Sequence, residues 1–481
     1  MATQTQNDQP GQGQRHGPHH VIAALLLSGG FAAYLAAIIL RSDLFADLSA
    51  ALILCFIAVN LRHASRIVQL FAGASVLIAG LGMAMGSIGP AELQVAAGRV
   101  SFLTSILVAL IFLRLVAQRD SAFAAAGAYL ANQPPSRRYV SLGIGGNLFG
   151  VLLNLGGLGL LIEMTLAGQR RLEAASAVSH AVHDIRERRI VTAIVRGFAT
   201  IAFWSPFGIA LNTLLLILTD LHWADAAPWG IGFSIGFLVL GAIMDVIERR
   251  LFPVFPRPVV VPPQRGDAVG LWVVLGHLVG LACLVILGDQ LLPLRFQEVL
   301  VTIVPIYALI WAMARFGLGG PARLRDDFFA NSVRYVNEVG VFALAGLIGA
   351  LLVAMVPQHA LDPVLLGIVD LGGPIALVLA LAWATLALAM LGLHPIISVV
   401  VLAEFMARTP LISELATLLA LLTGWTLTVC LAPLATTATY VGAILNRGPV
   451  RVSLIWNGIF GLVALTGFSA VLVAGIAAGW F

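Results

Sequence analysis

The sequence contains no lysine and carries little charge of either sign. All 27 of its basic side chains are arginines, there are 23 acidic side chains, and charged residues make up only 10% of the 481 positions. Hydrophobic residues make up 60%, and the mean hydropathy is +0.98. A soluble domain cannot hide so much apolar surface, so most of this chain must face lipid. The net charge of +4 does not indicate nucleic-acid binding, because the arginines follow a membrane topology.

Cysteines and catalytic motifs are also scarce. Cys55, Cys283 and Cys430 are scattered through apolar segments, and their spacing indicates neither a metal site nor a disulfide. No HExxH motif, acidic cluster or nucleotide-binding loop is present, so we expect no cofactor and neither an enzyme nor a self-contained primary pump. Two alternatives stay open: a membrane enzyme acting on a lipid-linked substrate, and a channel or membrane subunit of a multi-component transport system.

Long apolar runs recur along the chain, with the roughly 18–25 residues needed to cross a hydrocarbon core. They predict an all-α polytopic protein with about eleven transmembrane helices, at 21–40, 44–61, 67–87, 94–117, 190–218, 226–248, 268–291, 298–316, 338–356, 412–446 and 453–478. Two further apolar stretches have internal breaks, marked by glycine in the first and by glycine and proline in the second. We interpret these stretches, 139–168 and 365–406, as helical hairpins that enter the membrane and return to the same side.

Arginine placement supports this topology. With the N-terminus inside, only five arginines lie outside or within the membrane, which leaves 22 of the 27 on the cytoplasmic side. The five exceptions are Arg41, Arg99, Arg196, Arg295 and Arg408. Reading either hairpin as one full span would invert every later segment and spoil this bias. We therefore expect a multi-pass protein of a bacterial inner membrane with a cytoplasmic N-terminus and a periplasmic C-terminus.

A proline-rich cytoplasmic linker divides the chain into two halves. The expected parts are a disordered cytoplasmic tail at 1–20, scaffold helices at 21–93, a first repeat at 94–248, the linker at 249–267, a second repeat at 268–446 and a final span at 447–481. Two arginine-rich amphipathic stretches, 170–189 and 321–338, are expected to lie along the cytoplasmic interface.

The two halves share an order of parts: a spanning helix, a hairpin and a helix broken in its middle. Asn154, at the first hairpin turn, lies nine residues before Glu163, and Pro395, at the second, lies nine before Glu404. The arginine topology makes the hairpins enter from opposite sides, so the repeats are inverted. Inverted repeats are typical of secondary transporters.

The broken helices are interrupted near 205–208 and near 432–437. Backbone N–H groups freed at such breaks can hold an anion, and freed carbonyls can hold a cation. Polar or conformationally special residues gather at the breaks and hairpin turns. The candidate substrate-binding residues are Asn154, Gly156, Ser205, Pro206, Asn212, Thr213, His394, Pro395, Ser398, Thr436 and Thr437. The candidates for ion or proton coupling are Asn154, His394, Asp370 and Thr439.

Several of these residues have a purely structural alternative. A mid-span proline can be a simple kink, and serine or threonine can bond its own helix carbonyl. His394 could carry a proton or bind a carboxylate, or it could bond locally at a hairpin tip. Arg196 could snorkel to the cytoplasm or neutralise an anion.

The chain resembles the ion transporter superfamily, which includes divalent anion/sodium symporters and arsenite permeases. The resemblance rests on the hairpin residues 147–154, the broken helix 205–212, the second hairpin tip 392–395 and the last broken helix 432–437. It implies a homodimeric elevator-type transporter in which the hairpin tips and broken helices hold substrate and coupling ions. This chain lacks the Ser-Asn-Thr motif that symporters of the superfamily carry at both tips, so sodium and proton coupling both stay open.

The combined expectation is a secondary active transporter. It would move a small anion, a carboxylate or an inorganic oxyanion, by symport with sodium or protons, and it would need no cofactor.

Overall fold

The computed structural model describes residues 17–134, 137–174, 180–251 and 265–481. Most of the predicted tail at 1–20 and of the linker at 249–267 therefore lies outside the described residues. Within the described ranges all regular structure is helical and no strand occurs.

The helices follow one another with short connections. The first half contains α1 (Pro18–Leu40), α2 (Asp43–Asn60), α3 (Arg66–Ala84), α4 (Pro90–Arg119), α5 (Ser121–Ala131), α6 (Arg138–Leu153), α7 (Leu155–Ala174), α8 (His180–Ala199), α9 (Ile201–Trp204), α10 (Ile209–Leu215) and α11 (Trp223–Leu251). The second half contains α12 (Arg265–Leu291), α13 (Phe296–Phe316), α14 (Gly320–Asn331), α15 (Val336–Met355), α16 (Gln358–Met390), α17 (Pro395–Arg408), α18 (Glu414–Leu431), α19 (Thr436–Leu445) and α20 (Trp456–Ala478). Short helical turns occupy Leu61–His63, Gly317–Gly319, Ser332–Tyr335 and Arg451–Ile455.

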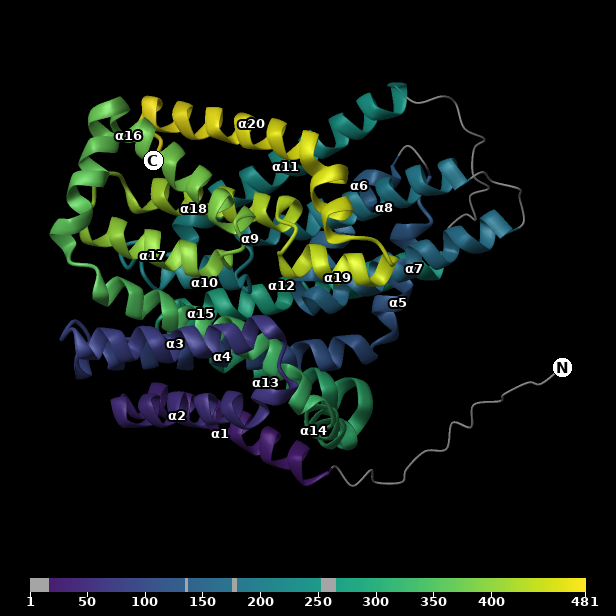
Figure 1. Cartoon of the computed structure of the whole chain (residues 1–481). Helices are drawn as coiled ribbons and strands as arrows, with labels where there is room; N and C mark the ends of the chain where they lie inside the picture. The colour runs from purple at the N-terminus through teal and green to yellow at the C-terminus, as the bar shows by residue number, and fades with distance from the viewer. Residues whose placement is uncertain (1–16, 135–136, 175–179, 252–264) are drawn as a thin grey trace.

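Eleven helical stretches in the described part of the chain are long and apolar enough to cross a membrane. The number agrees with the prediction, but the membership differs in two places. One stretch, Phe296–Met355, combines two predicted spans, and another, Asp362–Met390, contains the first arm of the second predicted hairpin. Between α13 and α15 the helix α14 lies across the other helices and is seen end-on in Figure 1, as its amphipathic sequence predicted. The stretch 170–189 instead divides between the end of α7 and the start of α8.

The spanning helices form two layers that meet at α4 and α15. In Figure 1 the lower layer contains α1, α2, α3 and α13, and the upper layer contains both hairpins, the broken helices, α11 and α20. The helices α4 and α15 pack against each other, and α15 also packs on α3 and on α17. The two layers are therefore in contact through these two helices.

Each predicted hairpin is a pair of helices joined by a tight turn. In the first, α6 and α7 meet at Asn154, which has a φ of 53°. In the second, α16 and α17 meet at Gly392, whose φ of 98° favours glycine. A kink at Gly372 and Gly373 divides α16, so the hairpin arm begins after this kink. The part of α16 before the kink precedes the second hairpin in the chain, as α5 precedes the first.

The repeats agree in packing as well as in order. In the first repeat, a Cβ on Gly197 of α8 would lie 1.8 Å from the Gly143 carbonyl oxygen of α6. In the second, a Cβ on Gly424 of α18 would lie 2.5 Å from the Ala382 carbonyl oxygen of α16. Each of these glycines precedes the mid-span proline of its own helix by nine residues. Small residues let membrane helices approach this closely, so both hairpins are seated on their broken helices in the same way.

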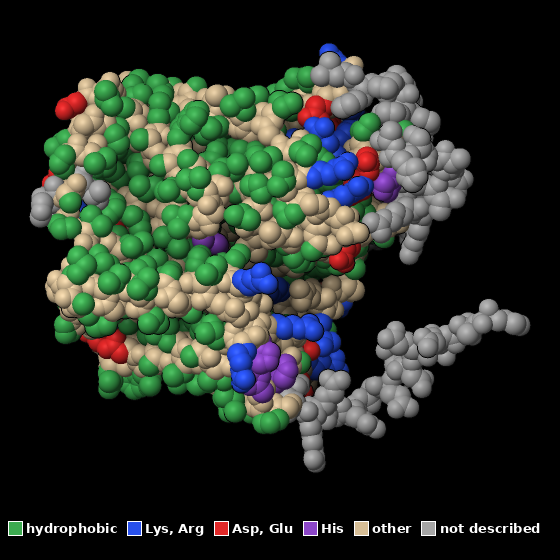
Figure 2. Space-filling model, in the orientation of Figure 1, with side chains coloured by type: hydrophobic (Ala, Val, Ile, Leu, Met, Phe, Trp, Pro, Cys, Tyr) green, Lys and Arg blue, Asp and Glu red, His purple; other side chains and the backbone are tan. Residues whose placement is uncertain are grey.

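Charge gathers at the two ends of the bundle, and arginine gathers mainly at one of them. Figure 2 shows arginine, acidic and histidine side chains concentrated at the end where α5, α8 and α14 lie, beside a largely apolar flank. Ion pairs at this end join α4 to α14 and α15, and α8 to α11 and to the residues after α19; they are Arg119–Asp327, Arg114–Glu338, Arg188–Glu248, Arg189–Asp245 and Arg447–Asp184. The helix α1 starts at this end, and the C-terminus lies at the other. The start of α1 and the C-terminus thus lie at opposite ends of the bundle.

The close approach of α6 and α8 makes Gly197 a sensitive position. Gly197→Ala is expected to lower the free energy of unfolding by about 1–3 kcal/mol or more, because the new methyl group meets backbone that cannot move aside. The measurement is thermal unfolding of the purified protein in detergent.

The matched control is Gly276→Ala in the interior of α12, where a Cβ would meet nothing within 4 Å. This variant should keep wild-type stability or gain slightly, since alanine favours helix. Equal melting temperatures for the two variants would contradict the packing described above.

Candidate functional site

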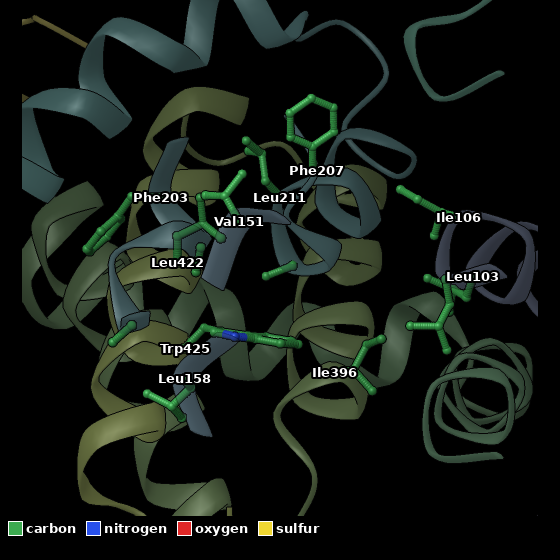
Figure 3. Close-up of a cluster of buried hydrophobic side chains, with 14 of the residues drawn as sticks. Leu103, Ile106, Val151, Leu158, Phe203, Phe207, Leu211, Ile396, Leu422 and Trp425 are labelled. Atoms are coloured by element: carbon green, nitrogen blue, oxygen red, sulfur yellow. The ribbon is translucent and has the colours of Figure 1, made fainter. Parts of the chain in front are cut away.

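The predicted site residues lie on four elements: the two hairpin tips and the two helix breaks. The half-helix after each break packs on the hairpin of the other repeat, with α10 against α17 and α19 against α7. Figure 3 shows Val151 and Leu158 of the first hairpin, Phe207 and Leu211 of the first break, and Ile396 of the second hairpin in one buried cluster. The first break and both hairpins therefore meet in one apolar cluster, and the second break joins them through the packing of α19 on α7.

The first break satisfies its own polar groups. Ser205 is fully buried, and its hydroxyl accepts a hydrogen bond from the Phe207 N–H at 3.2 Å. The Asn212 amide donates to the Pro206 carbonyl at 2.7 Å and to the Gly208 carbonyl at 2.9 Å. Thr213 donates to the Ile209 carbonyl at 2.7 Å. These side chains replace hydrogen bonds that the proline interrupts. The sequence left this structural role open as the alternative to substrate binding.

Two polar atoms near this break have no partner within the described residues. They are the Asn212 Oδ1 and the Ser398 Oγ, and both residues are only 1% exposed. Asn212 lies on α10 and Ser398 lies on α17, the two elements that pack together. A buried acceptor without a partner is costly, so this contact is the part of the predicted site with spare hydrogen-bonding capacity.

The second break is more open. Its half-helix α19 begins after Ala435, which provides no side-chain cap for the first N–H groups. Thr436 and Thr439 are exposed, whereas Thr437 is 6% exposed. Exposed N–H groups at a helix start attract negative charge. Leu434 of this break also lies close to the second hairpin tip, because a Cβ on Gly392 would be 3.0 Å from it.

His394 caps the second arm of its hairpin. Its Nδ1 accepts a hydrogen bond from the Ile396 N–H at 3.3 Å, and Pro395 occupies the first position of α17. Its ring lies edge-on to Phe71, Phe342 and Trp425, at centroid distances of 6.3, 5.9 and 6.5 Å. The Nδ1 bond requires the neutral ring to carry its proton on Nε2, which leaves Nε2 as the atom available to a ligand.

Asp370 does not join these residues. It is exposed and precedes the kink at Gly372 and Gly373, at the base of the second hairpin. The helical arm from Pro374 to Met390 separates it from the tip by about 25 Å. Asp370 is therefore placed apart from the other predicted coupling residues.

At the first tip, Asn154 is partly buried and its N–H donates to the Gly150 carbonyl at 2.9 Å. Gly156 follows it beside the end of α4, since a Cβ there would lie 2.9 Å from the Gln118 Nε2 and 3.7 Å from the Arg114 Cδ. The first hairpin tip thus faces α4, as the ring of His394 in the second tip faces Phe342 of α15.

Arg196 does not snorkel to water. It is 3% exposed, and its guanidinium donates to the Asn457 Oδ1 and to the Tyr139 hydroxyl, both at 2.9 Å. Its guanidinium carbon lies 4.0 Å from the centroid of Phe460. The expectation of an exposed head group is wrong because these neutral groups of α6 and α20 hold the charge inside the protein.

Sequence reasoning gave no role to two ion pairs on α4. Arg114 makes a two-bond contact to Glu338 at 2.9 and 2.8 Å, and Arg99 pairs with Glu404 of the second hairpin. A signal for the second pair was present, because Arg99 is one of the five arginines that break the positive-inside pattern. Arg41 and Arg408 are further exceptions, and they bond to Glu298 and to the Val353 carbonyl.

Comparison with known proteins supports the fold. No protein family and no curated protein sequence matches this chain. Among solved structures it resembles the Alcanivorax borkumensis YdaH transporter, described as having an unusual topology. The two share 17% sequence identity with a TM-score of 0.58, over 86% of this chain and 99% of that one. This chain therefore has the fold of a membrane transporter. Membership of the ion transporter superfamily is not confirmed.

The capping role of His394 can be separated from binding. His394→Ala is expected to lower stability by about 0.5–2 kcal/mol, because the Ile396 N–H loses its acceptor. His394→Asn should retain most of the stability, since asparagine caps helices well. Thermal unfolding of the three proteins measures this. Equal melting temperatures for His394→Ala and wild type would contradict the cap.

Proposed function

We propose that this chain is a secondary active transporter that moves a small anion across the inner membrane, coupled to sodium or protons. The observation that supports this most directly is the reciprocal packing of each half-helix on the opposite repeat's hairpin, α10 on α17 and α19 on α7. In a transporter fold, such packing supports a site between the backbone breaks and the hairpin tips of both repeats.

The anion preference rests on charge. The uncapped start of α19 offers backbone N–H groups, and His394 offers Nε2 at the second hairpin tip, whose Gly392 lies beside Leu434 of the second break. No carboxylate is found among the residues predicted to bind substrate. Carboxylates and inorganic oxyanions suit such donors, and a cation would gain little from them.

The mechanism we propose is an elevator. The upper layer of helices, with both hairpins, would move against α1, α2, α3 and α13, and these lower helices would form a homodimer. The two-layer arrangement in Figure 1 supports a division of this kind. The same proposal includes coupling to sodium or protons and a cytoplasmic N-terminus.

Reconstituted protein tests the proposal. Liposomes containing the purified chain should take up a labelled carboxylate or oxyanion when a sodium or proton gradient is imposed, and ionophores that collapse both gradients should stop the uptake. Candidate substrates can first be selected by thermal shift, because a ligand that binds the folded state raises its melting temperature. Uptake that continues unchanged without either gradient would contradict coupling.

Substitutions at the two tips test the site. Asn154→Ala and His394→Asn are expected to lower uptake at least about tenfold while the protein stays folded, because each removes a side chain placed at a hairpin tip. Thr466→Val is the control, since this exposed residue on α20 bonds only to carbonyls of its own helix. Wild-type kinetics in both tip variants would contradict the site.

A further inference from the structure

The two repeats are built alike, but they differ in exposure. On α10 of the first repeat, Asn212 and Thr213 are each 1% exposed beneath the second hairpin. On α19 of the second repeat, Thr436 and Thr439 are exposed beside the first hairpin. The crossing of α10 with α17 is therefore closed, and the crossing of α19 with α7 is open.

The glutamates of the two hairpins show the same asymmetry. Glu404 lies on α17 nine residues after Pro395, and it forms an ion pair with Arg99 of α4. Glu163 lies on α7 nine residues after Asn154, and it is exposed. Among the side chains that the structure describes, which leave out those of 168–181, Glu163 has no ion-pair partner. One hairpin is thus fastened to α4, and the other is not.

The Arg99–Glu404 ion pair is largely shielded from solvent. The side chain of Arg99 is 10% exposed and that of Glu404 is 20% exposed, so little solvent screens the pair. Two more polar contacts lie nearby, from Arg408 to the Val353 carbonyl at 3.3 Å and between Thr409 and Asp362 at 3.3 Å. The second hairpin is therefore attached to α4 and α15 at the end of the bundle that is poor in arginine.

A cation also lies beside the first hairpin. Arg114 is on α4, like Arg99, and in this conformation it pairs with Glu338 near the start of α15. The helix α7 carries Glu163 and lies against Arg114 and Tyr440, because a Cβ on Gly156 would lie 3.7 Å from the Arg114 Cδ. Gly159 of α7 is next to the Tyr440 phenol, since a Cβ there would lie 2.4 Å from its oxygen.

We propose that Arg99–Glu404 is a latch that closes the second hairpin in this conformation, and that in the opposite conformation it opens while Glu163 closes on Arg114. In transporters built from inverted repeats, one repeat moves against the other around the binding site. We take the two crossings to exchange their open and closed arrangements in such a movement. Arg99, Glu404, Arg114 and Glu163 are then positioning residues. The inference rests on the proposed transport function and concerns which side of the site is open.

Labelling of introduced cysteines tests the latch independently of transport. Cys55 and Cys283 are exposed and are first replaced by serine, and Cys430 is buried. Ser398→Cys then reports on the closed crossing and Thr439→Cys on the open one. In lipid nanodiscs, a water-soluble maleimide should label the cysteine at 439 rapidly and the one at 398 slowly.

Glu404→Gln is expected to raise the labelling rate at 398 at least about fivefold and to lower it at 439 by a similar factor, as a shift between two conformations requires. Exchanging the charges, with Arg99→Glu and Glu404→Arg together, should restore both wild-type rates. Glu298→Gln is the matched control, because it breaks the Arg41–Glu298 pair in the other layer at the same end. It should leave both rates unchanged.

Adding Glu163→Gln to the Glu404→Gln protein tests the second contact. The labelling rate at 439 should return toward the wild-type value, because the opposite conformation loses its own ion pair. Two results would overturn the latch: unchanged labelling at 398 in Glu404→Gln, or faster labelling at 398 without slower labelling at 439, which is local loosening. Since labelling needs no substrate, failure of the latch and failure of the transport assay are separate results.

Discussion

The constraint on which the structure depends is that backbone polar groups inside lipid must find partners within the protein. A helix broken in mid-membrane survives only if something replaces the missing bonds. At the first break Ser205 and Asn212 do so, by bonding the Phe207 N–H and the carbonyls of Pro206 and Gly208. Packing of each hairpin on its broken helix covers the rest. The glycines at 197 and 424 permit this, because any larger residue would hold the helices apart.

The same constraint explains the buried charges. An arginine within the membrane needs either water or a specific partner. Arg99 has Glu404, Arg114 has Glu338, and Arg196 has a phenol, an amide and an aromatic ring. In the first two cases the partner lies on a different element, so each pair also fixes how two helices stand relative to one another. Arg196 joins α6 to α20 in the same way, and it has no carboxylate partner within the described residues.

The architecture could be predicted from the sequence because each of its signals is local or additive. Apolar runs predict the spans, and the structure has eleven stretches of that kind in its described part. A count of arginines predicts the direction of each span, and this stays a prediction. Glycine and proline mark the hairpin turn before His394 and both breaks. The boundaries differ in small ways: α1 begins at Pro18, where a proline in the first turn is favourable, and α16 includes the residues before its kink.

The site was predicted less completely because its geometry depends on contacts across more than two hundred residues. Nothing local shows that Arg99 meets Glu404, or that the Asn212 amide N–H groups bond the backbone of their own break while its Oδ1 has no partner within the described residues. Asp370 seemed relevant as a carboxylate in a hairpin, but the kink that follows it places it at the base of that hairpin. Residue type indicated where polar groups occur, and packing decided which of them remain available.

The asymmetry between the repeats gives these contacts a direction. A symmetric bundle of inverted repeats would open to both ends or to neither, and either state would be useless for moving a solute against a gradient. Here Asn212 and Ser398 are buried and Glu404 is only partly exposed, while Thr436, Thr439 and Glu163 are exposed. A single ion pair on one side is enough to favour such a state, because two conformations that differ by a few kcal/mol shift strongly in population when one contact is lost. The latch must also be weak enough to break during each cycle. The partial exposure of Glu404, and a conformation in which Glu163 and Arg114 form an equivalent pair, would both keep the energy difference between the two states small.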